Sequence, residues 1–186
     1  MKKLLVIIAL LITVNSFSQY FDGIHISGDA AAVMQKFRAK GYRLIKTESN
    51  AYAMKGEANG VDVELYLLAT PITKKAYSVK VYLSEKISWY SLKSEYNRFK
   101  DILTNKYGSN DKDYEYFEEP YFEGDGYETS AVKLEKVHYL SFWFDNQNTN
   151  LCIEITKWMQ VCITYENATA AEVNKKEKEK KESNTF

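Results

Sequence analysis

The sequence predicts an α+β fold: an antiparallel sheet of about seven or eight strands with two main helices packed on one face. Two observations lead to this. Segments in which apolar and polar residues alternate recur along the chain, and short turn-type segments separate them. Two other segments repeat their apolar residues every three or four positions, as amphipathic helices do, and each precedes a group of strand-like segments. Short connections between consecutive strands favour antiparallel meanders.

Length and composition suit one folded domain. The chain has 186 residues, of which 45% are apolar, so a globally disordered protein is excluded. The formal charge is zero, and no basic cluster indicates a nucleic-acid surface. The chain is unusual in its 15 Tyr, 9 Phe and 3 Trp residues. Such enrichment is typical both of recognition surfaces and of Tyr packed at sheet edges, and composition does not choose between them.

The amino terminus has the three parts of a secretory signal peptide. Two lysines follow the first Met, residues 4–14 are apolar, and residues 16–18 (SFS) have the small-x-small pattern of a cleavage site. We therefore expect cleavage after Ser18 and a periplasmic or secreted location. The apolar run is shorter than the roughly 20 residues of a membrane helix, so no transmembrane span is expected after processing.

The first half of the mature chain is predicted to hold one helix and several strands. Residues 21–27 are strand-like, and a helix follows to residue 40, with Val33, Met34 and Phe37 as its apolar stripe and Gly41 as its end. Four strands come next, at residues 42–47, 51–55, 61–69 and 77–84. In the last two, apolar positions alternate with polar or amphipathic ones, so one sheet face should be buried and the other wet.

A longer amphipathic helix is predicted for residues 88–108 (SWYSLKSEYNRFKDILTNKYG). Ser88 or Ser91 can cap its start, and Gly108 can end it in a left-handed conformation. At 1.5 Å per residue it is roughly 30 Å long, enough to lie across a small sheet. Its apolar stripe is made of Trp89, Leu92, Tyr96, Phe99 and Leu103, widened by Ile102 and Tyr107.

Residues 109–128 form an acidic, aromatic insertion that we expect to be a loop. Its carboxylates admit four readings: a solvated loop, a partner- or glycan-binding loop, a weak cation site, and the acid and base pair of a glycoside hydrolase. A calcium loop of the helix-loop-helix type is excluded, because Tyr116 stands where Gly is required and Phe122 where the closing Glu is required. The carboxylates that could act as such a pair are Glu118, Glu119, Glu123 and Asp125.

Three further strands are predicted at residues 137–144, 150–156 and 160–165, with residues 131–135 as a possible fourth and residues 145–149 as a turn. In the first of these strands both alternating sets of side chains are largely apolar. Tyr139 and Trp143 could therefore lie on the same sheet face as Tyr66 and Tyr82, if their strands are neighbours. This would make the second face of the sheet aromatic rather than simply polar.

Cys152 and Cys162, the two cysteines of the chain, lie on the two arms of a predicted hairpin. A turn centred on Lys157 would place them directly opposite each other, where an oxidising compartment permits a cross-strand disulfide. The alternative is two unpaired thiols on a sheet face. The tail that follows, residues 168–186, is rich in Lys and Glu, and we expect a frayed, solvated helix.

Motifs for familiar chemistry are missing from the sequence. The two histidines, His25 and His138, lie far apart and outside any zinc-binding spacing. The chain has no GxxxxGK[ST] or GxGxxG phosphate-binding loop and no GxSxG elbow. We therefore expect no cofactor, no metal and no nucleic-acid partner.

Several stretches of the chain resemble known proteins. FDGIHISGDAAAVMQKFRAKGY, SWYSLKSEYNRFKDILTNKYG and EEPYFEGDGYE, followed by MQVCITYEN, resemble a group of small exported bacterial proteins to which no activity is assigned, over most of residues 21–167. The repeated plan of a helix and a meander is similar to the β-lactamase-inhibitor-like fold. Members of that fold present a sheet face to protein partners, so the resemblance implies a binding module.

The predicted domains are a signal peptide (1–18), one α+β domain (19–167) with possible repeats at 21–85 and 88–166, and the charged tail (168–186). The expected function is an exported, non-enzymatic binding module of the bacterial envelope that recognises a protein or a glycan. The alternatives are an envelope glycan hydrolase, with its carboxylate pair in residues 118–125, and a carrier of a small apolar ligand. The candidate binding residues are Tyr66, Tyr82, Tyr116, Glu118, Glu119, Tyr121, Glu123, Asp125, Tyr139 and Trp143.

Overall fold

The computed structural model describes residues 20–144 and 149–183. The predicted signal peptide lies outside the described residues, as do positions 145–148 of the predicted turn and the last three residues of the tail.

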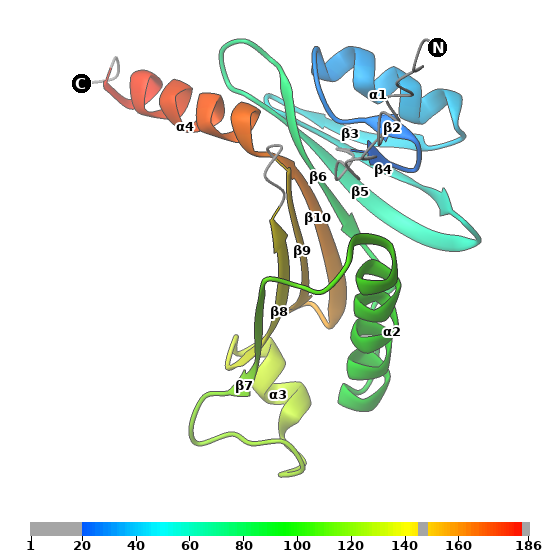
Figure 1. Ribbon diagram of the computed structural model, residues 1–186, viewed down its shortest axis with the longest axis vertical. Helices are drawn as coiled ribbons and strands as arrows, with labels where there is room; N and C mark the ends of the chain where they lie inside the picture. The colour runs from blue at the N-terminus through cyan, green and yellow to red at the C-terminus, as the bar shows by residue number, and fades with distance from the viewer. Residues whose placement is uncertain (1–19, 145–148, 184–186) are drawn as a thin grey trace, which may run out of the picture.

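An eight-stranded antiparallel sheet forms the centre of the protein, with the strand order β3-β4-β5-β6-β10-β9-β8-β7 (Figure 1). The predicted α+β, antiparallel architecture is thereby confirmed. A separate two-stranded hairpin, β1 (Tyr20–Phe21) and β2 (Ile24–His25), replaces the predicted first strand. The strands of the main sheet are β3 (Arg43–Glu48), β4 (Ala51–Ala58), β5 (Val61–Ala69), β6 (Ala76–Tyr82), β7 (Lys112–Phe117), β8 (Val137–Phe144), β9 (Thr149–Thr156) and β10 (Gln160–Asn167).

Two helices cover one face of this sheet. Helix α1 (Ala30–Ala39) packs on the half that contains β5, and α2 (Trp89–Tyr107) packs on the half that contains β9 and β10 (Figure 1). One continuous core lies between the helices and the sheet, and the short helix α3 (Glu128–Lys133) adds to it. Among the core side chains with at most 1% exposure are Phe37, Leu65, Tyr96, Trp143 and Ile153.

Local sequence explains where the two main helices begin and end. The Asp29 carboxylate accepts a hydrogen bond from the Ala32 N–H at 3.0 Å and caps α1. The Ser88 hydroxyl accepts one from the Ser91 N–H at 3.3 Å and caps α2, which ends at Gly108 with φ 87°. The predicted stripe of α1 is buried, and so are Trp89, Leu92, Tyr96 and Leu103 of α2. Phe99 and Tyr107 are partly buried against the core, whereas Ile102 is 47% exposed and does not widen the stripe.

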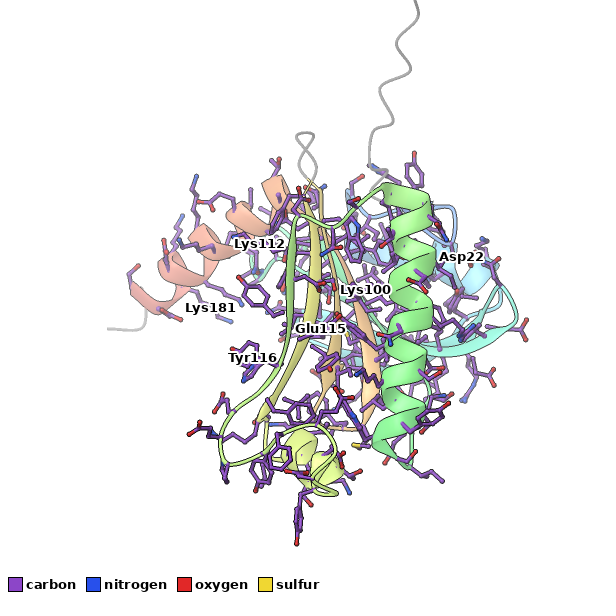
Figure 2. The ribbon with its side chains drawn as sticks, turned by 60° about the horizontal axis from the view of Figure 1, so that its bottom comes forward. Asp22, Lys100, Lys112, Glu115, Tyr116 and Lys181 are labelled. Atoms are coloured by element: carbon purple, nitrogen blue, oxygen red, sulfur yellow. The ribbon has the colours of Figure 1, made fainter. Side chains whose placement is uncertain are left out.

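The second half of the chain differs from the prediction in one strand. Residues 131–135, a possible strand by sequence, belong largely to α3, and the fourth strand is instead β7, within the predicted loop. Lys100 of α2 forms ion pairs with Asp113 and, at 2.7 Å, with Glu115, which keeps the acidic strand β7 against the sheet (Figure 2). The Ser141 hydroxyl of β8 also donates to Asp113 at 2.6 Å. These contacts join residues distant in sequence, so local alternation did not indicate them.

The charged tail forms a helix with a defined attachment, α4 (Ala168–Ser183). The Asn167 side chain accepts a hydrogen bond from the Ala170 N–H at 2.9 Å and caps its start. Glu177, only 9% exposed, accepts hydrogen bonds from the Ile72 N–H at 2.6 Å, the Thr73 N–H at 3.1 Å and the Thr73 hydroxyl at 2.5 Å. The expectation of a frayed, solvated tail is therefore wrong at Glu177, which holds α4 to the turn between β5 and β6.

Each half of the chain contributes one of the two main helices and then four strands to the main sheet, and in the second half α3 lies between β7 and β8. The last strand of each half, β6 and β10, pair with each other at the centre of the sheet. Duplication of one unit stays a prediction.

Candidate binding face

The sheet face opposite α1 and α2 is the candidate site, and we call it the open face. The side chains of α1, α2 and α3 enter the core on the other face, and α4 leaves the sheet at its end (Figure 1). Figure 2 shows Tyr116 of β7 on the side of the sheet that faces away from α2. Helices α1, α2 and α3 therefore lie on the other face, and α4 contacts β6 and β10.

Strand register arranges the side chains of the open face in rows that run across the sheet. Neighbouring Cα partners place one row in the order Tyr66, Lys80, Thr164, Cys152, Phe142, Lys112. The next row runs Lys55, Glu64, Tyr82, Cys162, Glu154, Leu140, Tyr114. Each row has aromatic residues near both ends. Between them lie Lys80, Thr164 and Cys152 in the first row, and Cys162, Glu154 and Leu140 in the second.

One end of the rows carries a cluster of three rings, Tyr66, Tyr82 and Trp158. The rings of Tyr66 and Tyr82 are 5.6 Å apart at 82°, and those of Tyr82 and Trp158 are 6.4 Å apart at 74°. The cluster borders a cavity of about 510 Å³, whose other lining residues are Glu64, Leu68, Lys80 and Gln160. The predicted residues Tyr66 and Tyr82 are thus brought together, in contact and facing a cavity.

The polar groups of this cluster are held in place by hydrogen bonds. Glu64 accepts a hydrogen bond from the Tyr66 hydroxyl at 2.7 Å and pairs with Lys55 at 3.1 Å. The bond to Glu64 raises the pKa of Tyr66 to about 12. Burial alone would raise the pKa of Glu64, but Tyr66 and Lys55 outweigh it and keep that pKa below its usual range. At neutral pH the cavity therefore presents an ionised carboxylate and a neutral phenol.

The other end of the rows carries a second aromatic cluster, on β7 and β8. Tyr116 stacks on His138 with ring centres 4.7 Å apart, and Tyr114 meets Phe142 edge to face at 6.3 Å. Phe144 stacks on Phe142 at 5.9 Å. Tyr116, Tyr114 and Phe144 are 50%, 44% and 42% exposed. Of this cluster, only Tyr116 was a predicted site residue.

Cys152 and Cys162 lie in the middle of the open face, and both are free thiols. The predicted disulfide is therefore wrong. The turn between β9 and β10 is centred on Trp158, not on Lys157, so Cys152 pairs with Thr164 and Cys162 pairs with Glu154. The thiols are diagonal neighbours rather than directly opposite. Burial raises the pKa of Cys152 to about 12 and that of Cys162 to about 11, and burial also raises the pKa of Glu154.

Tyr139 and Trp143 do not join Tyr66 and Tyr82. Both lie on the face covered by helices, with 3% and 0% of their surface exposed, so the expectation of a shared face is wrong. The Trp143 ring N–H donates to the Gly108 carbonyl at 2.9 Å, and Tyr139 packs against Trp89 and Tyr96 of α2. The residues of β8 that reach the open face are His138, Leu140, Phe142 and Phe144 instead.

The predicted carboxylates of the insertion are separately engaged. Glu118 lies 2.6 Å from both Lys136 and His138. Glu123 accepts hydrogen bonds from Lys93 at 2.5 Å and from the Trp89 ring N–H at 3.3 Å. The Asp125 carboxylate accepts hydrogen bonds from the backbone N–H groups of Phe122 at 3.1 Å and Tyr127 at 2.7 Å. Glu119 is exposed, and Tyr121 is half-buried against the core.

These contacts lower the pKa of the two paired Glu residues. The hydrogen bond from Lys136, followed by that from His138, holds the pKa of Glu118 below its usual range. The hydrogen bond from Lys93 has the same effect on the pKa of Glu123. Both side chains are therefore ionised at neutral pH, as anchors of the loop and not as proton donors.

Sequence reasoning missed Trp158, Tyr114, Phe142 and Phe144. Trp158, which is 57% exposed, does carry a signal: a large aromatic residue in the tight turn of a hairpin has little core to enter. For Phe142 and Phe144 there was no such signal, because both faces of β8 are apolar. Tyr114 could be identified as a site residue only if β7 was first recognised as a strand.

Over residues 20–144 and 149–183, no group of three or more His, Cys, Asp or Glu side chains is arranged to hold a metal ion. Within the same ranges, no helix combines the length and apolar character needed to cross a membrane. Comparisons of the chain with protein-family models, with curated proteins and with solved structures found no match.

Proposed function

We propose that the protein is an exported, non-enzymatic binding module and that the open face is its binding surface. The observation that supports this most is the pair of exposed aromatic clusters on the sheet face opposite α1 and α2. Export rests on the signal-peptide pattern of residues 1–18.

Exposure of these aromatic residues is the reason for choosing binding over a purely structural role. Trp158, Tyr116, Tyr114 and Phe144 are each at least 42% exposed, although the opposite face of β8 is buried. Aromatic side chains gain much from burial, and Tyr and Trp are the residues most enriched at the energetic centres of interfaces. A partner that covers the open face would complete the burial that α1 and α2 achieve on the other face.

The contacts of the insertion favour binding over glycan hydrolysis. A glycosidase needs one carboxyl group with a raised pKa as the general acid. Glu118 and Glu123 instead have lowered pKa values, and Asp125 is occupied by backbone N–H groups of its own loop. A carrier of an apolar ligand is also disfavoured, because side chains such as Phe37, Tyr96 and Trp143 occupy the space between helices and sheet.

Photo-crosslinking from the two faces tests the proposal. Benzoylphenylalanine placed at Phe142 or Tyr82 reports on the open face, and the same group at Tyr90, which is 83% exposed on α2, is the matched control. In envelope extract, we expect a discrete adduct from positions 142 and 82 and none from position 90. Adducts of equal yield from position 90, or none from either open-face position, would contradict the proposal.

A further inference from the structure

Two neighbouring cavities form one continuous trough at the edge of the open face. The cavity of about 510 Å³ beside Tyr66 and Trp158 adjoins one of about 710 Å³, and both are lined by Glu64, Tyr82 and Gln160. Small-molecule sites commonly measure about 300–1,000 Å³, so the two together offer room for more than one compact unit.

The trough exists because β5 and β6 separate. Their pairing ends at Glu64 and Tyr82, beyond which the chain leaves β6 and follows β10 instead. The Leu83 N–H donates to the Val161 carbonyl at 2.9 Å, and the Lys86 N–H donates to the Met159 carbonyl at 2.8 Å. The Gln160 amide also donates to the Leu83 carbonyl at 3.0 Å. Among the described strands, residues 61–63 of β5 therefore pair only with β4, and the gap beside them is fixed by backbone hydrogen bonds.

Aromatic rings line one half of this trough. Tyr66, Tyr82 and Trp158 stand edge to face along it, and Trp158 is 57% exposed. Aromatic rings that are partly exposed to solvent suit a ligand that has both apolar C–H faces and hydroxyl groups. The C–H face of the ligand packs on the aromatic ring while its hydroxyls stay hydrated.

Planar polar groups line the other half, and the charges of the whole trough balance. Carboxylates, a guanidinium and an amide are groups that can each bond two adjacent hydroxyls. The cationic residues that line the two cavities are matched in number by the anionic ones, so neither a polyanion nor a polycation is attracted by net charge. These residues are Arg43, Lys55 and Lys80 against Asp62, Glu64 and Glu85.

From this arrangement we infer that the trough binds a neutral oligosaccharide, with sugar rings stacked on Tyr82 and Trp158 and hydroxyls bonded to the polar half. The inference rests on the proposed function, since it names the ligand class of one part of the open face. An apolar lipid chain would remove the charged groups of the polar half from water without offering them hydrogen bonds.

Intrinsic fluorescence tests the inference because the three tryptophans differ in exposure. Trp89 and Trp143 are 8% and 0% exposed and Trp158 is 57% exposed, so acrylamide quenching reports mainly on Trp158. The probes are chitotetraose, cellotetraose, maltotetraose and mannotetraose, compared with a heparin tetrasaccharide as the polyanion and tetraalanine as a neutral peptide. We expect at least one neutral tetrasaccharide to protect Trp158 from acrylamide, and neither comparator to do so.

Calorimetric titration of variants then places the bound sugar. Trp158→Ala and Tyr82→Ala should each weaken binding about tenfold or more, as the loss of a stacking ring does, and Tyr90→Ala on α2 should leave it unchanged. Protection by none of the neutral sugars, preference for heparin or tetraalanine, or affinities that the two trough variants leave unchanged would each overturn the inference. If open-face crosslinks to a protein persisted in that case, the proposed function would stand and only the ligand class would fall.

Discussion

Replacing Glu177 by Gln should detach α4 from the turn between β5 and β6. The carboxylate accepts bonds from Ile72 N–H, Thr73 N–H and the Thr73 hydroxyl, at 2.6, 3.1 and 2.5 Å. Hydrogen bonds to a charged group contribute about 1.5–3 kcal/mol each, but they are not additive and α4 lies at the surface, so we expect a total loss of about 2 kcal/mol. Such a loss changes the docking equilibrium of α4 about 30-fold.

Hydrogen exchange measures this effect where it occurs. Few apolar residues of α4 are buried, and a 16-residue helix without tertiary support is marginal in water, so amides of residues 170–183 should exchange faster in E177Q. Amides of β5 and β9 should be unaffected. The matched control is Glu179→Gln, an exposed position on the same helix. Equal exchange in α4 for both variants would refute the role assigned to Glu177.

The same contact has a defined pH dependence. Burial alone would raise the pKa of Glu177, but the bonds from Thr73 and Ile72 outweigh it and lower that pKa. A lowered pKa means that the stabilisation is complete above the ordinary Glu pKa and is lost as the pH falls through the lowered value. Acidification should therefore loosen α4 in the native protein and change little in E177Q.

Two other predictions test the assignment of sheet faces. At pH 8 both cysteines should resist labelling by Ellman's reagent until denaturant is added, because burial raises the pKa of Cys152 to about 12 and that of Cys162 to about 11. The Tm should also be the same with and without reductant, because the thiols are free. Fast labelling of the folded protein or a reductant-dependent Tm would contradict this. Trp143→Ala should lower the free energy of unfolding by about 3–5 kcal/mol, whereas Phe142→Ala, at the next position but on the open face, should cost about 1 kcal/mol, as measured by urea denaturation. A reversed order would mean that β8 presents the opposite face to α2.

The parts of the fold that depend on local chemistry could be predicted from the sequence. Helix α2 begins and ends within one residue of its prediction, since Ser88 caps it and Gly108 terminates it. The bounds of β5 and β8 agree with their predictions, because alternation and turn residues mark both. Strand β7 could not be predicted in this way. Its acidic residues are held by Lys100 and Ser141, which lie on other elements.

The candidate site was harder to predict than the fold, because it depends on register. Alternation in β8 offered two apolar faces, and contacts with α2 decide between them: Tyr96 lies 2.7 Å from Ser141, and Trp143 bonds the Gly108 carbonyl. Neighbouring residues of a strand point to opposite faces, so choosing the wrong alternating set assigned both Tyr139 and Trp143 to the face of Tyr66 and Tyr82. Likewise, moving the turn centre from Lys157 to Trp158 shifted the partner of Cys152 by two positions.

Hydroxyl-radical footprinting tests most directly whether the open face is the binding surface. The mature protein is oxidised in buffer and in envelope extract, and modification of individual side chains is compared by mass spectrometry. If a partner covers the open face, oxidation of Trp158, Tyr114 and Tyr116 should fall in extract while that of Tyr90 on α2 stays constant. Unchanged oxidation of all three open-face residues, or protection of Tyr90 instead, would contradict the proposed surface.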